Sequence, residues 1–166
     1  MRCLFLAGLV LLVCPATAHA TDDAQAETLH AEAGALLDQG KLDEACPRFD
    51  DAYRASLRVA HLIDAADCYE RAGKTGSAWE RFRAASGASE RYGEDDVGRV
   101  VDERRARLEP NLTLLTIEVA PAVRATPGLA LKVNQRAVPL DLAVPVDPGT
   151  VTVDADAPEA RQVLLR

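Results

Sequence analysis

Apolar residues recur at helical spacing through the first two thirds of this 166-residue chain. A periodic stripe of this kind predicts amphipathic helices. Gly40, Gly73 and Gly93 stand where a helix ends in the left-handed conformation that glycine tolerates. We therefore predict five helices: residues 24–39, a second from Asp43, a third over about 60–71, a fourth from Thr75 or Ser77 to about Arg91, and a fifth from Asp95 or Asp96 to about Leu108.

Side-chain caps are predicted at three of the helix starts. Asp43 is expected to cap the second helix, and Asp95 or Asp96 the fifth. Ser77 and Glu80 stand three residues apart, which is the spacing of a capping box at the start of the fourth helix.

The fifth helix is predicted to be amphipathic and to cover the apolar end of the helical array. Its apolar side is expected to carry Val97, Val100, Val101 and Leu108. We interpret its charged side as a solvated face, with a binding site as the alternative; that side carries Arg99, Glu103, Arg104 and Arg107.

After Pro110 the apolar period changes from 3.6 to 2 residues, which indicates strands. Five or six short strands are expected, the last of them at Val163–Leu165, and Asp147-Pro148-Gly149 is predicted to form a tight turn. The alternating apolar positions are Leu115, Ile117 and Val119, then Leu129, Leu131 and Val133, then Val151 and Val153. The predicted fold class is α+β, with helical hairpins followed by a small antiparallel β-sandwich.

The helical stretch also repeats itself every 33 positions between residues 29 and 85. A period of this length indicates stacked helical hairpins, which more often hold other molecules than carry out bond chemistry. The matched pairs are Leu29 and Leu62, Ala33 and Ala66, Leu36 and Tyr69, Gly40 and Gly73, Ala45 and Ala78, Phe49 and Phe82, and Ala52 and Ala85.

The small–aromatic–small spacing at Ala45, Phe49 and Ala52, repeated 33 residues later, resembles the helix pairs of tetratricopeptide (TPR) repeats. The later segment VDPGTVTVDADAP resembles the small β domains called PEGA modules. Together with an apolar N-terminus, this layout is similar to exported TPR-plus-PEGA-like proteins of Gram-negative bacteria. The resemblance implies three parts: a signal peptide over residues 1–20, a TPR-like helical domain over 21–110 and a PEGA-like β domain over 111–166.

The N-terminus has the pattern of a cleaved export signal. Arg2 precedes the apolar run Cys3–Val13, and Ala18-His19-Ala20 is a small-x-small cleavage site. Lipidation at Cys14 is the alternative, which the bulky Val13 disfavours. Cleavage after Ala20 removes one basic residue and leaves 18 basic against 26 acidic residues, a net charge of −8. That acidity argues against nucleic acid as a partner, and we expect a periplasmic or secreted protein with no stable membrane insertion.

Cys46 and Cys68 are the two cysteines that remain after signal removal. An even pair in an exported protein favours a disulfide, and in stacked hairpins the two helices that carry them are neighbours. Two buried thiols in alanine-sized gaps are the alternative.

The sequence contains no grouping that predicts catalysis. His30 and His61 lie 31 residues apart, without the paired spacing of a zinc site, and no phosphate-binding glycine loop is present. A four-ligand site from these histidines and the two cysteines is a remote alternative. We therefore predict no enzyme activity, no metal and no cofactor.

The TPR resemblance implies a partner-binding groove on the inner faces of the first helix of each hairpin. In this chain the groove positions are His30, Gly34, Asp38, Ile63, Asp67 and Glu70. The alternative is that they are ordinary solvent-facing positions. An acidic groove is expected to prefer basic or neutral peptides.

Two functions follow from this reading. The first is a non-enzymatic scaffold that binds a protein or peptide of the cell envelope through its helices. The alternative is a cell-wall or saccharide binder that uses the β domain, which the absence of Phe, Trp and Tyr from residues 111–166 disfavours. Trp79, the single tryptophan, is expected to be a core residue, with a ligand platform as the alternative.

Overall fold

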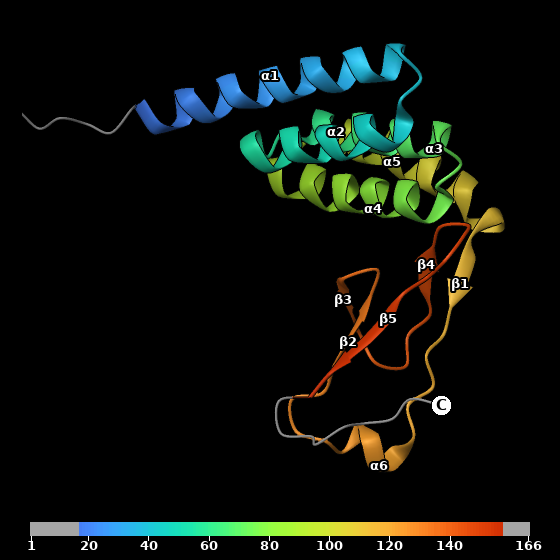
Figure 1. The fold of residues 1–166 in the computed structure, drawn as a ribbon. Coiled ribbons are helices and arrows are strands. Elements are labelled where there is room, and N and C mark those ends of the chain that lie inside the picture. The colour runs from blue at the N-terminus through green and yellow to red at the C-terminus, as the bar shows by residue number, and fades with distance from the viewer. Residues whose placement is uncertain (1–16, 158–166) are drawn as a thin grey trace, which may run out of the picture.

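The computed structural model describes residues 17–157. Most of the predicted signal peptide and the expected last strand at Val163–Leu165 lie outside the described residues. Within them, helices α1 to α5 form one body and the strands form a second body beneath one end of it (Figure 1). We call these parts the helical half and the β half.

The helical half contains the five helices that the periodicity predicts. α1 begins at Thr17, earlier than the predicted start at residue 24. Each helix from α1 to α4 packs against the next helix along the chain. The bounds are α1 Thr17–Asp38, α2 Leu42–Ser56, α3 Val59–Arg71, α4 Thr75–Tyr92 and α5 Asp95–Leu108, with a short 3-10 helix at Glu109–Asn111.

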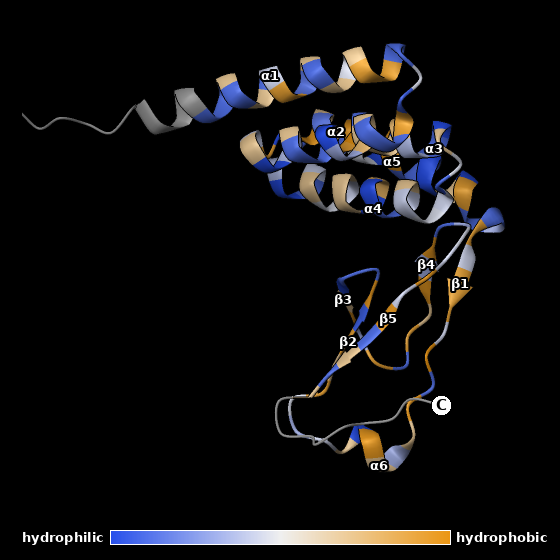
Figure 2. Ribbon diagram, viewed as in Figure 1, coloured by the Kyte–Doolittle hydropathy of each residue, from blue (hydrophilic) through white to orange (hydrophobic). Residues whose placement is uncertain are grey.

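The 33-residue register corresponds to a real core. Among the repeated pairs, the alanine and phenylalanine pairs are buried in both copies: Ala33 and Ala66, Ala45 and Ala78, Phe49 and Phe82, and Ala52 and Ala85. Alanines let neighbouring helices approach closely, and the phenylalanines fill the space between them. Apolar and polar segments alternate along the ribbons of these helices (Figure 2), and the buried apolar residues form one cluster.

The predicted caps do not form at the starts of α2 and α5. The residues before these helices are Lys41 and Glu94, and neither makes a side-chain cap bond. In each turn the residue after the glycine donates its N–H five residues back, from Lys41 to Leu36 and from Glu94 to Ser89, both at 2.9 Å. The next helix starts so soon after this turn that Asp43 and Asp95 already lie in its first turn.

Only part of the predicted apolar side of α5 is buried: Val101 and Leu108 are, whereas Val97 and Val100 are not, at 36% and 48% exposed. Gly98 is buried as well. Gly98 lies at the contact because a Cβ there would be only 3.4 Å from the Cβ of Ser89. Close helix approach at a glycine therefore set the face, rather than the most apolar side.

The β half consists of two antiparallel sheets, which confirms the α+β class. β1 pairs with β4, and β2 lies between β3 and β5. The expected strand does not continue through Ile117 and Val119, and a short helix that the sequence did not predict follows at α6 Pro121–Arg124. The strands are β1 Thr113–Leu115, β2 Ala130–Val133, β3 Arg136–Val138, β4 Val144–Val146 and β5 Val153–Asp156.

Candidate functional site

The predicted groove face is formed by α1 and α3, and side-chain contacts connect these two helices. Nε2 of His30 on α1 lies 2.9 Å from a carboxylate oxygen of Asp64 on α3, and both side chains are about 40% exposed. The His30 ring also meets the edge of Phe49, with 5.2 Å between ring centroids. The imidazole is therefore held in place at an accessible surface.

Asp67 and Glu70 form the second part of this face, and α5 supplies their partner. The guanidinium of Arg104 lies 2.5 Å from Asp67 and 3.3 Å from Glu70. The hydrogen bond with Asp67 raises the pKa of Arg104, and the guanidinium also covers the ring of Phe82 at 4.5 Å. Together with Arg71, these side chains line a hollow of about 330 Å³.

The pairing with Arg104 changes the expected charge of the groove. The interpretation of the charged side of α5 as merely solvated does not hold for this residue, which crosses to α3. Two carboxylates predicted to attract basic peptides are already close to a cation, so the face presents mixed charge rather than an acidic strip.

For the other three groove candidates, Gly34, Asp38 and Ile63, the structure shows no polar contact to a neighbouring helix among the described residues. A Cβ on Gly34 would meet no atom within 4 Å, so this position opens onto free space. Asp38 is exposed at the end of α1, and Ile63 is partly buried against the helical core. The structure thus brings Asp67 and Glu70 together and leaves Gly34 as an open gap on α1.

The cysteines are bonded, as predicted. The S–S distance between Cys46 and Cys68 is 2.11 Å and their Cα atoms are 5.3 Å apart, so neither sulfur is available to a metal. His61 lies only 5.2 Å from His30 between ring centroids, yet residues 17–157 contain no cluster of three or more metal-ligating side chains. His61 is 4% exposed, and burial lowers its pKa.

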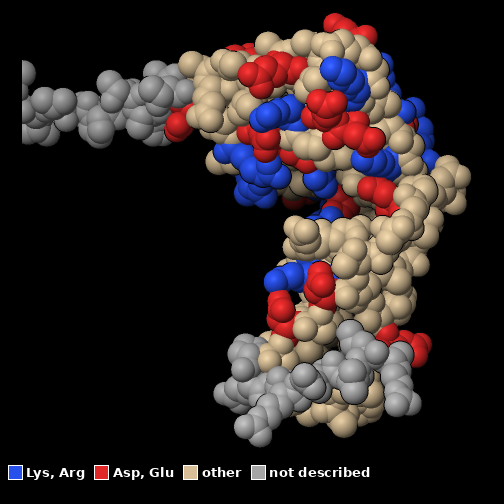
Figure 3. All heavy atoms as spheres, viewed as in Figure 1, with Lys and Arg blue, Asp and Glu red and all other residues tan. Residues whose placement is uncertain are grey.

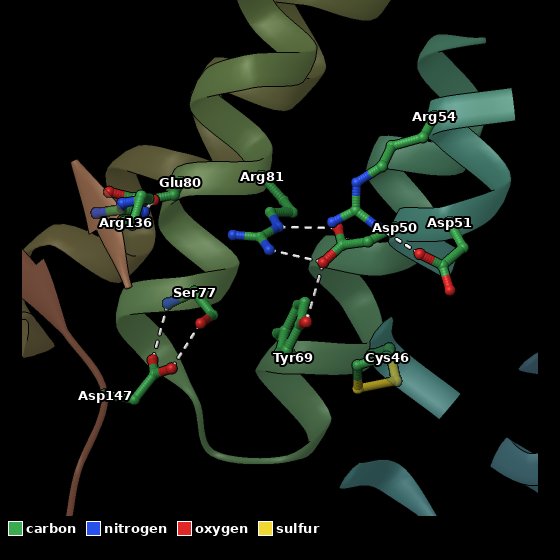
Figure 4. A network of polar contacts seen from close by, with 11 residues as sticks. Cys46, Asp50, Asp51, Arg54, Tyr69, Ser77, Glu80, Arg81, Arg136 and Asp147 are labelled. Atoms are coloured by element: carbon green, nitrogen blue, oxygen red, sulfur yellow. Dashed lines mark hydrogen bonds and ion pairs between the residues drawn. A yellow bond between two sulfur atoms is a disulfide. The ribbon is translucent and has the colours of Figure 1, made fainter. Parts of the chain in front are cut away.

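A buried polar network inside the helical half escaped the sequence analysis. Arg81 on α4 donates two hydrogen bonds to Asp50 on α2, at 2.9 and 2.6 Å, and the Tyr69 hydroxyl donates a third at 3.0 Å (Figure 4). Burial and the charge of Asp50 raise the pKa of Tyr69. The one available signal was Tyr69 itself, a polar-tipped residue at the position that Leu36 occupies in the first repeat.

The β half is attached to the first turns of α4. The N–H of Ser77 donates to Asp147 at 2.8 Å and its hydroxyl donates to the other carboxylate oxygen at 2.5 Å, while Arg136 pairs with Glu80 (Figure 4). The predicted capping box of Ser77 and Glu80 is therefore wrong, because both residues bind partners in the β half. Asp147 serves as the cap from 70 residues away.

Gly76 explains how the two halves come so close. A Cβ there would lie 2.7 Å from the carbonyl carbon of Val146 and 2.8 Å from its oxygen. The backbone at the end of β4 therefore packs directly on the helix, and only glycine leaves room for it.

Trp79 lies beside this junction rather than deep in the core. It is partly buried against the helical core, and the guanidinium carbons of Arg83 and Arg105 lie 6.0 and 5.8 Å from its ring centroid. Together with residues of β3, β4 and the loop between them, it lines a hollow of about 390 Å³.

The described surface has other hollows, two of which bear on the predicted sites. One of about 720 Å³ lies between α1 and α2, away from the predicted groove positions, and a small one of about 210 Å³ lies beside Ser77 and Asp147. Figure 3 shows charged side chains of both signs crowded over the helical half, whereas the visible face of the β half is mostly uncharged.

No helix among residues 17–157 has the length and apolar content needed to cross a bilayer. Comparison with protein families, with curated proteins and with solved structures finds no match to this chain. The assignment of function therefore rests on the geometry of the chain itself.

Proposed function

We propose that the protein is a non-enzymatic scaffold of the cell envelope that holds a protein or peptide partner against the faces of α1 and α3. The observation that carries the proposal is the contrast between a tightly packed core and an accessible polar face directly above it. His30, Asp64, Asp67 and Glu70 all keep at least 40% of their side-chain surface exposed. Stacked helical hairpins typically bind partners on such a face.

The partner is a neutral or mixed-charge segment rather than a strongly basic one. Arg104 already neutralises part of the charge of Asp67 and Glu70. We therefore expect binding to fall only modestly between about 50 and 200 mM salt, because exposed pairs of opposite charge have little net field to screen.

The proposed location is the periplasm or the cell exterior, after cleavage behind Ala20. The Cys46–Cys68 disulfide supports this location, because disulfides persist in oxidising compartments. Mass spectrometry of the exported protein tests it: a mature chain beginning at Thr21 is expected, and an intact Met1 or a lipid on Cys14 would refute it.

The binding face is tested by filling the gap at Gly34. The Gly34→Gln variant adds a neutral side chain to open space on α1, where glutamine also favours the helix by up to about 1 kcal/mol. Capture of envelope proteins by the full-length chain should fall about tenfold while the protein stays folded.

Ala35→Gln is the matched control. It places the same side chain one position further round α1, where Ala35 lines the separate hollow between α1 and α2. Capture should be unchanged. If Ala35→Gln abolishes capture and Gly34→Gln does not, the partner binds the α1–α2 hollow instead.

The alternative function, saccharide binding by the β half, has one observation in its favour. Residues 111–166 contain no aromatic ring, but α4 places Trp79 against β3 and β4. Trp79 is the single aromatic residue among those that line this hollow, whereas saccharide sites usually stack sugars on several rings, which leaves the peptide-binding scaffold as the better supported proposal.

A further inference from the structure

The hollow beside Trp79, which we call the junction pocket, has walls from both halves of the molecule. One wall is α4, with Trp79 and Arg83; the other is formed by residues 136–139 and 142–145 of the β half. Its volume of about 390 Å³ lies within the range of small-ligand sites, which occur preferentially at domain interfaces.

The β wall of the junction pocket is apolar and accessible. Leu142 is 61% exposed, and Pro139 and Ala143 beside it are exposed as well. Burying an exposed leucine side chain would be energetically favourable. Val138 and Val144 extend the same wall toward the sheet. An exposed apolar surface facing a tryptophan is suited to an aliphatic side chain.

Among the described residues, the charges around the pocket leave one cation without a carboxylate partner. Arg136 is paired with Glu80, and Arg105 lies 3.2 Å from Asp102. Arg83 is exposed, and no carboxylate within residues 17–157 comes within 4 Å of it. In a chain with net charge −7, the rim of this pocket is therefore locally positive.

We propose that the junction pocket binds a peptide segment in which an aliphatic side chain adjoins a carboxylate. The aliphatic group would lie between Trp79 and Leu142, and the carboxylate would accept hydrogen bonds from Arg83, whose planar guanidinium suits that geometry. The occupant is the C-terminal end of a chain, because a terminal aliphatic residue carries its side chain and its free carboxylate on the same Cα atom. The site shares no residue with the α1–α3 face, so it is a second binding site beyond the proposed function.

Trp79 makes the test direct, because it is the single tryptophan and reports on this pocket alone. The full-length protein is titrated with three acetylated peptides while indole fluorescence is followed: Ala-Leu-Leu with a free carboxylate, the same peptide with a C-terminal amide, and Leu-Glu-Leu amide. The free-carboxylate peptide is expected to give a saturable change and to bind about tenfold more tightly than its amide, as expected for hydrogen bonds to a charged group.

The third peptide separates the two sources of the carboxylate. Weaker binding of Leu-Glu-Leu amide than of the free acid is expected, because its carboxylate lies at the end of a separate side chain. Equally tight binding would indicate an internal acidic residue and would overturn the assignment to a chain end.

Two variants and two controls complete the experiment. Arg83→Gln should weaken binding of the free-acid peptide about tenfold without changing the affinity for the amide. Leu142→Ser should weaken binding of both peptides. Arg91→Gln, an exposed arginine on α4 that does not line the junction pocket, and Gly34→Gln on the other face should change neither.

Three further outcomes would overturn the proposal. One is the absence of a saturable change with any peptide, and another is equal binding of acid and amide. The third is a saturable change with a trimer of N-acetylglucosamine in place of the peptides, which would make the pocket a saccharide site.

Discussion

The helical half and the β half differ most in how much each of them buries. The helical core is a single cluster of 16 buried residues among those described, whereas the main cluster of the β half holds three, Val133, Val144 and Val146. Among residues 17–157, only the helical half carries a disulfide and an ion pair with a buried carboxylate, that of Asp50 with Arg81. A small sheet with so little core depends on outside support.

That support comes from a short stretch of α4. Gly76, Ser77 and Glu80 all contact the β half, through backbone packing, a carboxylate cap and an ion pair. The helical half is thus stabilised by its own core, whereas the β half is stabilised by its contacts with α4. Four experiments test this difference, beginning with the largest expected effect.

Removing Asp50 should do the most damage to the helical half. Asp50→Ala leaves Arg81, whose side chain is only 24% exposed, without its carboxylate partner and the Tyr69 hydroxyl without an acceptor, which should cost about 3–5 kcal/mol in urea unfolding. The neighbouring Asp51→Ala is the matched control: its pairs with Arg48 and Arg54 are largely exposed, so its cost should stay below about 1 kcal/mol. Equal costs for the two variants would show that the network does not stabilise the core.

Opening the disulfide should also weaken the helical half. Cys46 and Cys68 are separated by 22 positions, and the chain-entropy relation gives about 3 kcal/mol for a loop of this size. The double variant Cys46→Ala/Cys68→Ala should unfold at lower urea than the oxidised protein, and a reductant should then have no further effect on it. Two reactive thiols in the exported, non-reduced protein would contradict the bond.

Substituting Gly76 should separate the two halves. Gly76→Ala places a Cβ against the Val146 backbone, which should cost about 1–3 kcal/mol through overpacking and expose the β half to proteases first. Gly87→Ala, on the same helix, meets only an Arg91 side-chain nitrogen at 3.7 Å and should be stabilising by about 0.5–1 kcal/mol. Faster proteolysis of the helical half than of the β half in Gly76→Ala would show that the helices, not the sheet, depend on the contact.

The smallest expected effect is a pH dependence confined to the helical half. Burial lowers the pKa of His61 below its ordinary value of 6.5, so the unfolded chain binds a proton before the folded chain does. The free energy of unfolding should therefore decrease as the pH falls below about 6.5. The groups facing this ring are His30, Glu27, Asp64 and Arg58.

The His61→Gln variant isolates that contribution. Its urea stability should change less than that of the unmodified protein between pH 7.5 and 5, while the β half keeps the same protease sensitivity at both pH values. An unchanged slope would assign the pH dependence to other groups.

Local patterns determined much of this protein. Helical periodicity predicts α1 to α5, and the 33-residue register alone identifies buried pairs such as Phe49 and Phe82. The same register brought the helices of Cys46 and Cys68 together. These predictions succeed because the period of a helix and the stacking of equal hairpins follow from neighbours in the chain.

Tertiary structure decided what the polar residues do. Ser77 and Glu80 have the spacing of a local cap, but they bind Asp147 and Arg136 instead. Arg104 crosses to Asp67, and Trp79 meets a sheet that begins more than 30 residues later. A charged or aromatic side chain takes whichever partner the packed backbone brings within reach, and that choice depends on distances in space that no local spacing records.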